Sequence, residues 1–283
     1  MNIAVITGAS SGMGREFAVQ LDQCLGKTDE IWLLARRKEP LEKLADSMQI
    51  KARVIVIDLT DETALKQFEE VLAIQNPKIT VLVNCAGTGS HKLFARQNKE
   101  EIDAMIQLNI TALTRMTMLC LPYMKNGSKL IQVSSGAAFV PQSAFAVYAA
   151  SKAYVYSLSR ALGQELRGRG ITVTAVCPGP VNTPFLAHAY EDMSGFGALK
   201  RLTMAETACV VKKALEDCKT GKSVSICGLP VKLLYLSTQS VQNMMIKVTA
   251  QPYAILRVKS PSMRFCGLCR RQNAINPAER RLL

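Results

Sequence analysis

Seven short runs of β-branched and apolar residues alternate along the chain with stretches of helical spacing. The runs occupy residues 3–7, 30–35, 52–57, 79–83, 129–133, 171–176 and 223–226. After the first run, Phe17, Ala18, Leu21 and Leu25 share one helical face. Strands that are apolar on both faces and separated by helices predict an α/β fold: a doubly wound parallel sheet of about seven strands, flanked by helices, with right-handed crossovers. Ligands of such a sheet bind outside the carboxyl ends of its strands.

The first run turns directly into a glycine-rich loop that opens a helix. Its glycines are Gly8, Gly12 and Gly14. Between a strand and a helix, the first glycine permits a tight turn, the second lets the backbone approach a pyrophosphate, and the third allows close helix–strand packing. The helix N-terminus favours the phosphate charge. The loop therefore indicates a nucleotide site, although on its own it could be an ordinary strand–helix connection.

The second run ends in Arg36 and Arg37, with no acidic residue before Glu39. A carboxylate at this point binds the ribose 2′-hydroxyl of NAD, whereas an arginine accommodates the 2′-phosphate of NADP. The sequence therefore favours NADP(H) over NAD(H), with Arg36 as the better candidate because it comes first after the strand. The alternative is that the two arginines open an exposed helix. Asp58 ends the third run and could either accept a bond from the adenine amino group or take part in capping the next helix, for which Thr60 and Asp61 are good N-caps.

Tyr148 and Lys152 stand four residues apart in a stretch that favours a helix, so they share a face. A nearby ammonium group favours the phenolate, and we expect it to lower the Tyr148 pKa from about 10 toward neutrality. Tyr148 is then a candidate proton donor or acceptor. Ser135 ends the fifth run, where its hydroxyl could polarise a carbonyl. A Tyr-x-x-x-Lys pair alone more often lies on a solvated helix face.

Taken together, these residues resemble the short-chain dehydrogenase/reductase family over about residues 1–228. The motifs that carry the resemblance, in the family's order, are Thr7-Gly8-x-x-x-Gly12-x-Gly14, Asn84-x-Ala86-Gly87, Asn109, Ser135, Tyr148-x-x-x-Lys152 and Pro178-Gly179. The resemblance implies a single-domain Rossmann fold and an oxidoreductase acting on CH–OH and C=O groups. Cys85 replaces an asparagine that is often seen in the second motif, and we expect little effect from this change.

The resemblance also implies roles for individual residues. Tyr148 would be the general acid/base, Ser135 would hold the substrate oxygen, Lys152 would lower the Tyr148 pKa and bond the nicotinamide ribose, and Asn109 would hold a water in a proton relay. Thr183 would contact the nicotinamide amide. The expected cofactor-binding residues are Thr7, Gly8, Ser10, Ser11, Gly12, Met13, Gly14, Arg36, Arg37, Asp58, Leu59, Asn84, Ala86, Gly87, Tyr148, Lys152, Pro178, Gly179, Val181 and Thr183.

Two apolar segments bear on the substrate. In the resembling family the segment after Pro178-Gly179 covers the substrate, and here it contains Phe185, Leu186 and Tyr190, followed by Met193 and Phe196. Residues 229–258 have helical apolar spacing and could form a lid, a dimer contact or a membrane-surface contact. We expect a bulky hydrophobic, steroid- or lipid-like carbonyl or alcohol. The alternatives are a 3-oxoacyl-thioester or small-carbonyl reductase and a non-catalytic NADP-binding sensor or scaffold.

The chain has 283 residues and a formal net charge of +13, part of it in residues 259–283, a basic segment that we expect to be disordered. The charge is not interleaved with aromatics as in a nucleic-acid platform, so no nucleic acid is expected.

The nine cysteines are an odd number in mostly apolar runs, which favours a reducing compartment. The sequence shows no leader and no apolar run long enough to span a membrane, so we expect a cytoplasmic protein. The extension could add a peripheral membrane contact. The resemblance to the family implies a homodimer or homotetramer. Cys266 and Cys269 have zinc-like spacing but lack a second pair, so no metal is expected.

Overall fold

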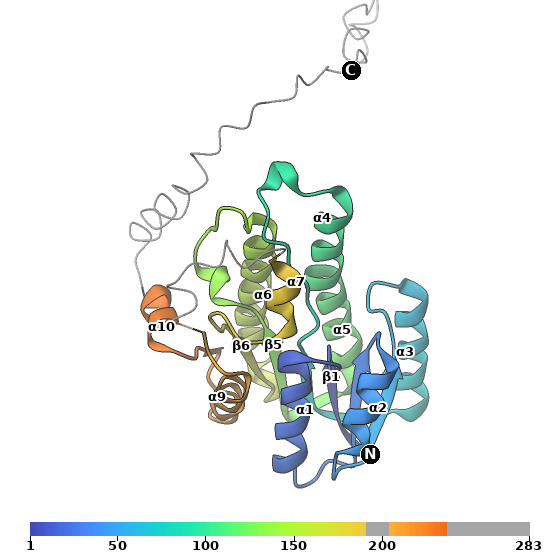
Figure 1. Cartoon of the computed structure of the whole chain (residues 1–283). Coiled ribbons are helices and arrows are strands. Elements are labelled where there is room, and N and C mark those ends of the chain that lie inside the picture. Colours follow the sequence, from blue (N-terminus) through green and yellow to red (C-terminus); the bar gives the residue numbers. More distant parts are fainter. Residues whose placement is uncertain (191–203, 237–283) are drawn as a thin grey trace, which may run out of the picture. The chain divides into compact units, whose positions relative to one another are not determined.

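Seven parallel strands form a single sheet in the order β3-β2-β1-β4-β5-β6-β7. The computed structural model describes residues 1–190 and 204–236, all within a compact unit of residues Met1–Thr249 (Figure 1). The strands are β1 Asn2–Thr7, β2 Glu30–Ala35, β3 Ala52–Val56, β4 Lys78–Asn84, β5 Met124–Val133, β6 Thr172–Val176 and β7 Val224–Ser225. The predicted doubly wound parallel sheet is confirmed, and the order of strands reverses between β1 and β4.

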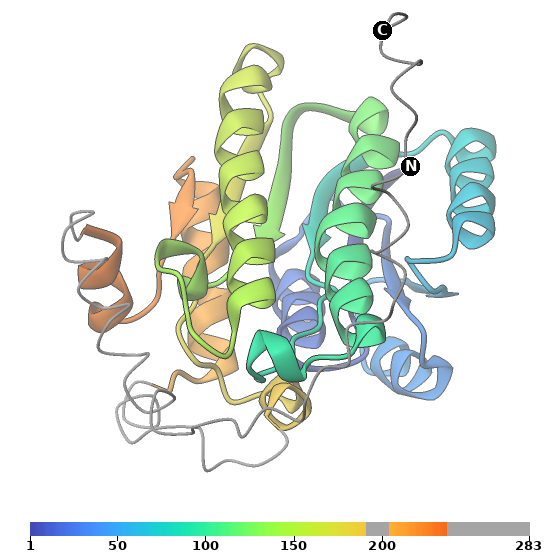
Figure 2. The same cartoon turned by 90° about the horizontal axis from the view of Figure 1, so that it is seen from above.

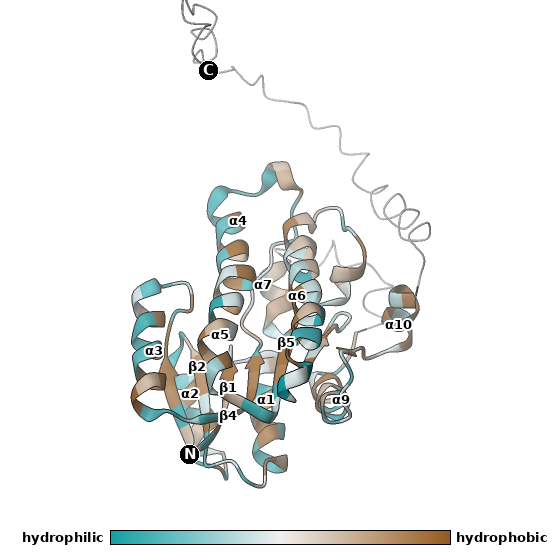
Figure 3. Ribbon diagram, turned by 180° about the vertical axis from the view of Figure 1, so that it is seen from behind, coloured by the Kyte–Doolittle hydropathy of each residue, from teal (hydrophilic) through white to brown (hydrophobic). Residues whose placement is uncertain are grey.

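Helices cover both faces of the sheet. They are α1 Gly12–Cys24, α2 Lys38–Asp46, α3 Glu62–Gln75, α4 Lys99–Ile106, α5 Leu113–Cys120, α6 Ala146–Glu165, α7 Pro184–Ala189, α9 Thr207–Lys219 and α10 Leu229–Leu236. One core cluster joins α1, α2 and α9 to the sheet, and a second cluster joins α3, α5 and the end of α6 to its other face. Figure 2 shows the layers from above, and Figure 3 shows the hydrophobic strands between helices whose outer surfaces are more polar.

The helical stretch Lys99–Tyr123 is interrupted at its centre. A π-helical turn, η2 (Gln107–Ala112), separates α4 from α5, and a short 3₁₀ turn, η3 (Leu121–Tyr123), follows α5. A π-helical turn inserts an extra residue into the helix and is frequent at functional sites. The turn contains Asn109, so it changes the direction in which this predicted site residue points.

The same stretch, Lys99–Tyr123, is long and apolar enough to cross a membrane by length and composition, although the sequence predicted no such helix. Met105, Leu113 and Met116 are almost completely buried. The stretch contacts β4 and α6 in the interior of the fold. We therefore interpret it as a core helix.

The C-terminal extension begins with a helix, as its spacing predicts. This helix, α10, packs on η4 (Gly136–Phe139), a short turn that follows β5. The second helix predicted near residues 244–248, the tail over residues 259–283, Met193, Phe196, Cys266 and Cys269 lie outside the described residues. The domain boundaries predicted at residues 228 and 258 stay predictions. Among the described residues, the cysteines are free and no metal-ligating cluster is found.

Candidate active site

Thr7 and Gly8 join the ends of β1 and β4, where the strand order reverses. The Thr7 hydroxyl accepts hydrogen bonds from the backbone N–H groups of Cys85 at 3.0 Å and Ala86 at 3.1 Å. Gly8 has φ +70°, and a Cβ at this position would lie 2.9 Å from the Ala86 backbone. A side chain at position 8 is therefore excluded both by backbone conformation and by space. This is the crevice in which open parallel sheets bind ligands.

The N-terminus of α1 is free to receive an anion. Its N-cap, Ser11, makes no side-chain capping bond, and the first turn contains no acidic residue. The first N–H groups of a helix lack intrahelical partners and carry a partial positive charge. Gly12 has φ +53°, with Thr183 facing it, and a Cβ on Gly14 would overlap the carbonyl oxygen of Gly8. These residues form a cradle that fits a phosphate group.

Both predicted arginines lie beside this cradle, but their positions differ. The Arg37 guanidinium donates hydrogen bonds to the hydroxyl groups of Ser10 at 3.1 Å and Ser11 at 3.0 Å. The Arg36 guanidinium lies 3.9 Å from the Asp58 carboxylate, and its side chain is 74% exposed. Arg37, rather than the preferred candidate Arg36, is therefore the arginine held against the glycine loop.

Asp58 and Asn84 make structural hydrogen bonds. Asp58 accepts bonds from the backbone N–H and the hydroxyl of Thr60, at 2.9 Å and 2.7 Å. The N-cap of α3 is Asp61. Asn84 is buried and donates to the Thr117 hydroxyl and the Gln132 side chain. The Asn84 side-chain amide nitrogen thus ties β4 to α5 and β5, while its side-chain oxygen has no hydrogen-bond partner among the described residues.

Asn109 is fully buried and fixed on three sides. Its side-chain oxygen accepts from the Thr88 N–H at 2.9 Å, and its amide donates to the Thr88 carbonyl at 2.8 Å and to the Ser151 hydroxyl at 3.0 Å. A Cβ on Gly87 would lie 3.1 Å from the Asn109 side-chain oxygen and 3.3 Å from Lys152 Nζ. The backbone at Gly87 therefore passes between Asn109 and Lys152. These are two members of the predicted catalytic tetrad, which consists of Asn109, Ser135, Tyr148 and Lys152.

The other three predicted tetrad residues meet at the carboxyl end of β5. The Ser135 hydroxyl lies close enough to Tyr148 to lower its pKa and accepts a bond from the Ala137 N–H at 3.1 Å. Lys152 Nζ donates to the carbonyl of Val133 at 3.0 Å and lies 5.7 Å from the centroid of the Tyr148 ring. The structure thus brings the whole tetrad together in one site.

Two supporting serines were not predicted. The Ser134 hydroxyl donates to the Lys152 carbonyl at 2.7 Å, which fastens α6 to the end of β5. The Ser151 hydroxyl donates to the Tyr148 carbonyl at 2.7 Å and accepts from Asn109. Both serines adjoin predicted residues in the sequence, but only the fold shows which group each one binds.

Burial sets the pKa values of both Tyr148 and Lys152. It raises the pKa of Tyr148 to about 12, against the lowering effect of the hydrogen bond from Ser135. Burial lowers the pKa of Lys152 to about 8, against the raising effect of the Cys85 and Cys177 thiols. The prediction that Tyr148 titrates near neutrality is wrong for the protein alone, because desolvation of the phenolate raises the pKa. The Tyr148 hydroxyl is therefore protonated at physiological pH.

Aromatic rings enclose Tyr148. The Phe145 ring stacks on it with a centroid separation of 4.2 Å, and Phe185 lies 5.4 Å away on α7. Tyr190 stacks on His91 at 4.3 Å. The predicted substrate residues Phe185, Leu186 and Tyr190 all belong to the same apolar cluster as Tyr148. Phe145 was not predicted, although it stands one helical turn before Tyr148.

The remaining predicted residues surround the site through backbone contacts and packing. The Pro178 carbonyl accepts a hydrogen bond from the Gly136 N–H at 2.7 Å, which holds the segment containing Gly179 against the turn after Ser135. Val181 is buried and pairs with Ala205 in a short bridge. The side chains of Met13 and Leu59 pack against the core. Any cofactor contact from Leu59 is therefore made by its backbone.

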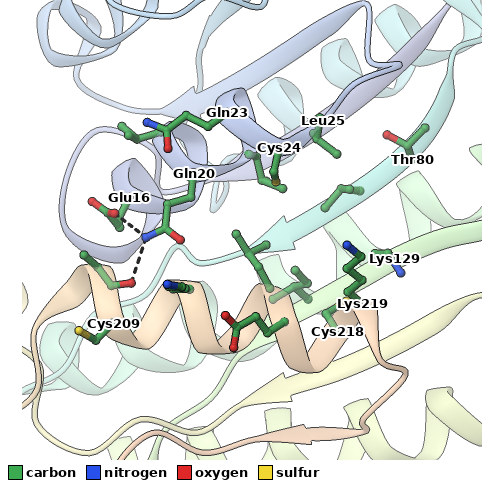
Figure 4. Close-up of a pocket in the computed structure, with 18 of the residues that line it drawn as sticks. Glu16, Gln20, Gln23, Cys24, Leu25, Thr80, Lys129, Cys209, Cys218 and Lys219 are labelled. Carbon is green, nitrogen blue, oxygen red and sulfur yellow. Dashed lines mark hydrogen bonds between the residues drawn. The ribbon is translucent and has the colours of Figure 1, made fainter.

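A pocket of about 830 Å³ lies elsewhere, between α1 and α9 (Figure 4). It is lined by Thr80 and Val81 near the start of β4, by Lys129 of β5 and by Cys24 at the end of α1. The Gln20 side-chain amide closes one part of its wall by donating to Glu16 at 2.7 Å and to the Ala208 carbonyl at 3.0 Å. No predicted site residue lines this pocket, so it is distinct from the candidate active site.

Comparison with known proteins agrees with this geometry. The family model described as short chain dehydrogenase matches residues 2–194. The chain is 32% identical over 185 residues to a 3-oxoacyl-[acyl-carrier-protein] reductase of Thermotoga maritima, covering 64% of this chain and 75% of the relative. It is 28% identical over 254 residues to 17-beta-hydroxysteroid dehydrogenase type 3 of Mus musculus, covering 83% and 78%. A short-chain dehydrogenase of Sphingobium yanoikuyae, solved in complex with NADPH, has a TM-score of 0.70 and 26% identity, covering 94% of this chain and all of that one.

Proposed function

Because this chain belongs to the short-chain dehydrogenase family and is an oxidoreductase, we propose that it uses NADP(H) to interconvert a ketone or aldehyde and an alcohol on a bulky hydrophobic substrate. The observation that carries the proposal is the proximity of the Ser135 side chain to the buried Tyr148 phenol, with Lys152 one helical turn further along α6. This arrangement sets two hydroxyl groups side by side, where both can bond a single carbonyl oxygen.

In the direction of reduction, the substrate oxygen accepts hydrogen bonds from the Ser135 and Tyr148 hydroxyl groups. Bound NADPH supplies the hydride that reduces the carbonyl carbon. As negative charge develops on the oxygen, the two hydroxyl groups stabilise it, and the Tyr148 proton transfers to it to complete the alcohol. Because the Tyr148 pKa is about 12, the phenol is protonated and ready to donate at neutral pH.

Lys152 and Asn109 support this proton transfer. With a pKa of about 8, the Lys152 side chain is mostly charged at neutral pH, and its charge favours the phenolate that forms when Tyr148 donates its proton. Lys152 and the Asn109 side chain both adjoin Gly87. We assign Asn109 to hold this region in place, together with a water that returns a proton to the site.

The preference for NADP(H) follows from the charge beside the phosphate cradle. Arg37 is anchored to Ser10 and Ser11, and Arg36 stands beside Asp58. Two guanidinium groups with no acidic residue at the end of β2 favour an added phosphate on the adenosine ribose. The related structure from Sphingobium yanoikuyae contains NADPH, which supports the same cofactor here.

The preference for a bulky apolar substrate follows from the aromatic cluster. Phe145, Phe185 and Tyr190 are packed close to the phenol that would donate the proton. Such walls favour an apolar ring system over a small polar carbonyl. The relative from Mus musculus is a hydroxysteroid dehydrogenase, which supports a steroid- or lipid-like substrate.

A 3-oxoacyl thioester is the second candidate substrate, because a relative of similar identity is a 3-oxoacyl-[acyl-carrier-protein] reductase. A thioester of this kind has a flexible acyl chain and a polar carrier. The two candidates therefore differ in the part of the substrate that would contact the aromatic cluster.

The test is a comparison of initial rates with NADPH and NADH across small aldehydes, polycyclic ketones and 3-oxoacyl thioesters. We expect a preference for NADPH of about tenfold or more and the highest kcat/KM on a polycyclic ketone. A preference for NADH would contradict the assigned cofactor. A higher kcat/KM on the thioesters would favour the second substrate. Tight NADPH binding without turnover on any class would favour a non-catalytic sensor or scaffold.

The oligomeric state and the location of the protein belong to the same proposal. Family members often form oligomers, and we propose a homodimer or homotetramer in the cytoplasm. Size-exclusion chromatography with light scattering tests the first part. A monomer at micromolar concentration would contradict it.

A further inference from the structure

Helix α10 is apolar on two opposite faces, and only one of them is packed. Val231, Leu234 and Tyr235 belong to a cluster with Phe139 and Tyr156. The rings of Phe139 and Tyr235 lie 5.1 Å apart. This face fixes α10 to η4 and α6, so the orientation of the helix is determined by packing.

The other face presents a leucine stripe, Leu229, Leu233 and Leu236, to solvent. These side chains are 68%, 60% and 68% exposed. Their spacing of four and three residues places them in one row along the helix. Figure 3 shows α10 as a ribbon coloured in part as hydrophobic, next to α9. Contiguous exposed apolar side chains commonly mark a binding surface.

A positive charge flanks the stripe. Lys232 is exposed on α10 next to Leu233, and no acidic residue lies within this helix. The whole chain has a formal net charge of +13. An apolar row with a cation at its edge, in a basic chain, complements an anionic lipid surface, where leucines enter the acyl boundary and cations meet the headgroups.

The size of the stripe also favours a lipid surface over a second protein chain. A stable protein interface buries about 800 Å² on each partner. A helix of eight residues is about 12 Å long, and a single row of three leucines covers only a small part of that area. A bilayer requires no complementary shape, and a short row of apolar side chains is sufficient for reversible contact.

From these observations we propose that the leucine stripe of α10, with Lys232, docks the protein reversibly on an anionic lipid bilayer. The docking does not depend on the proposed reaction. It does have a consequence for it, because Val231 of α10 lies against Gly136: a Cβ on Gly136 would be 3.0 Å from Val231 Cγ1. Since Gly136 follows Ser135, the packed face of the docked helix adjoins the turn that holds the candidate catalytic serine.

The test measures partition of the full-length protein onto vesicles by flotation. Vesicles of phosphatidylcholine with phosphatidylglycerol are compared with vesicles of phosphatidylcholine alone. We expect binding to the anionic vesicles, and we expect Leu233→Glu to lower the partition coefficient by about tenfold or more, because one buried leucine contributes at least that factor. Lys232→Gln should weaken binding to the anionic vesicles with little effect on the neutral ones.

The matched control is Ile74→Glu. Ile74 is an 84% exposed apolar residue on α3, away from α10. The Ile74→Glu substitution changes the net charge of the protein by the same amount as Leu233→Glu. We expect the partition coefficient of Ile74→Glu to lie within about twofold of the value that the added negative charge alone would give. Circular dichroism and turnover of a water-soluble ketone confirm that each variant is folded, and they separate a failure of docking from a failure of the proposed function.

Three results would overturn the proposal. The first is no binding of the unmodified protein to anionic vesicles. The second is equal loss of binding for Leu233→Glu and Ile74→Glu, which would assign the contact to net charge elsewhere in the chain. The third is a shift of Leu233→Glu to a smaller oligomer in size-exclusion chromatography with no change in vesicle binding, which would assign the stripe to a second copy of the chain.

Discussion

Replacing Lys152 with methionine removes an ammonium group that the fold holds almost entirely away from water. The residue is 4% exposed, and burial is the main reason that its pKa falls from 10.5 to about 8. A fall of this size corresponds to about 3 kcal/mol of unfavourable free energy when the folded protein binds the proton. Methionine cannot make the hydrogen bond that Lys152 donates to the Val133 carbonyl, and the loss of this bond costs the variant about 1 kcal/mol. We therefore expect Lys152→Met to be more stable than the unmodified protein by about 2 kcal/mol at pH 7.

The stability difference between the unmodified protein and Lys152→Met should depend on pH. Between pH 8 and pH 10.5 the unfolded chain binds a proton at Lys152 that the folded protein has lost. The free energy of unfolding of the unmodified protein therefore rises with pH in this window, relative to the methionine variant. The advantage of the variant should be complete below pH 8 and should disappear toward pH 10.5.

Urea unfolding followed by circular dichroism at pH 7 and pH 9.5 measures both quantities. The difference between the two proteins is the relevant quantity, because Tyr148 and the buried thiols titrate in both. Lys66→Met, at an exposed position on α3, is the control and should give a difference that does not change with pH. A Lys152→Met variant that is less stable at pH 7, or a difference that is constant with pH, would refute the argument that burial disfavours the ammonium group.

Three further predictions follow from the site. Arg37→Ala should raise the Kd for NADPH by about tenfold or more and change the Kd for NADH by less than about twofold, as measured by fluorescence titration; equal losses would contradict the assigned 2′-phosphate contact. Gly8→Ala should destabilise the protein by about 2 kcal/mol or more, because position 8 has φ +70° and lacks space for a side chain. Gly221→Ala, at φ +76° with open space around it, should cost only about 1 kcal/mol. Equal losses of unfolding free energy for the two variants in urea would contradict the steric argument. In pH–rate profiles, reduction should slow above about pH 8 as Lys152 loses its proton, while Tyr148, with a pKa of about 12, stays protonated; a rate that is unchanged up to pH 10 would contradict this role of the lysine.

The sheet and the glycine loop could be predicted from the sequence because each depends on local pattern. A buried parallel strand has a continuous apolar run, and the predicted runs match the strands within a few residues at most ends. β5 starts five residues earlier than predicted because Met124–Ser128 is polar in part and has no continuous apolar signal. β7 is shorter than predicted, with only Val224 and Ser225 paired to β6.

The site could be predicted as a set of residues but not as a set of contacts. The choice between Arg36 and Arg37 depends on which guanidinium reaches Ser10 and Ser11, and adjacent residues cannot be separated by spacing. At the π-helical turn, Asn109 makes tertiary hydrogen bonds with Thr88 and Ser151. Nothing in the residues 107–112 marks this turn.

The pKa prediction for Tyr148 was wrong for an identifiable reason. The spacing of Tyr148 and Lys152 correctly places a cation near the phenol, with the ammonium 5.7 Å from the ring centroid. The spacing carries no information on the burial of the site by Phe145 and Phe185. Desolvation is the largest influence on both groups and shifts both toward their neutral forms in the protein alone.

The most direct test of the account is the turnover of Tyr148→Phe with NADPH and the best ketone found for the unmodified protein. The substitution retains the ring that packs against Phe145 and Phe185 and removes only the hydroxyl that is to donate the proton. We predict that kcat falls by about a thousandfold or more, while the Kd for NADPH stays within about threefold of its original value, because the assigned phosphate contacts are untouched. Turnover within about tenfold of the unmodified protein, with NADPH still bound, would contradict the assignment of Tyr148 as the proton donor.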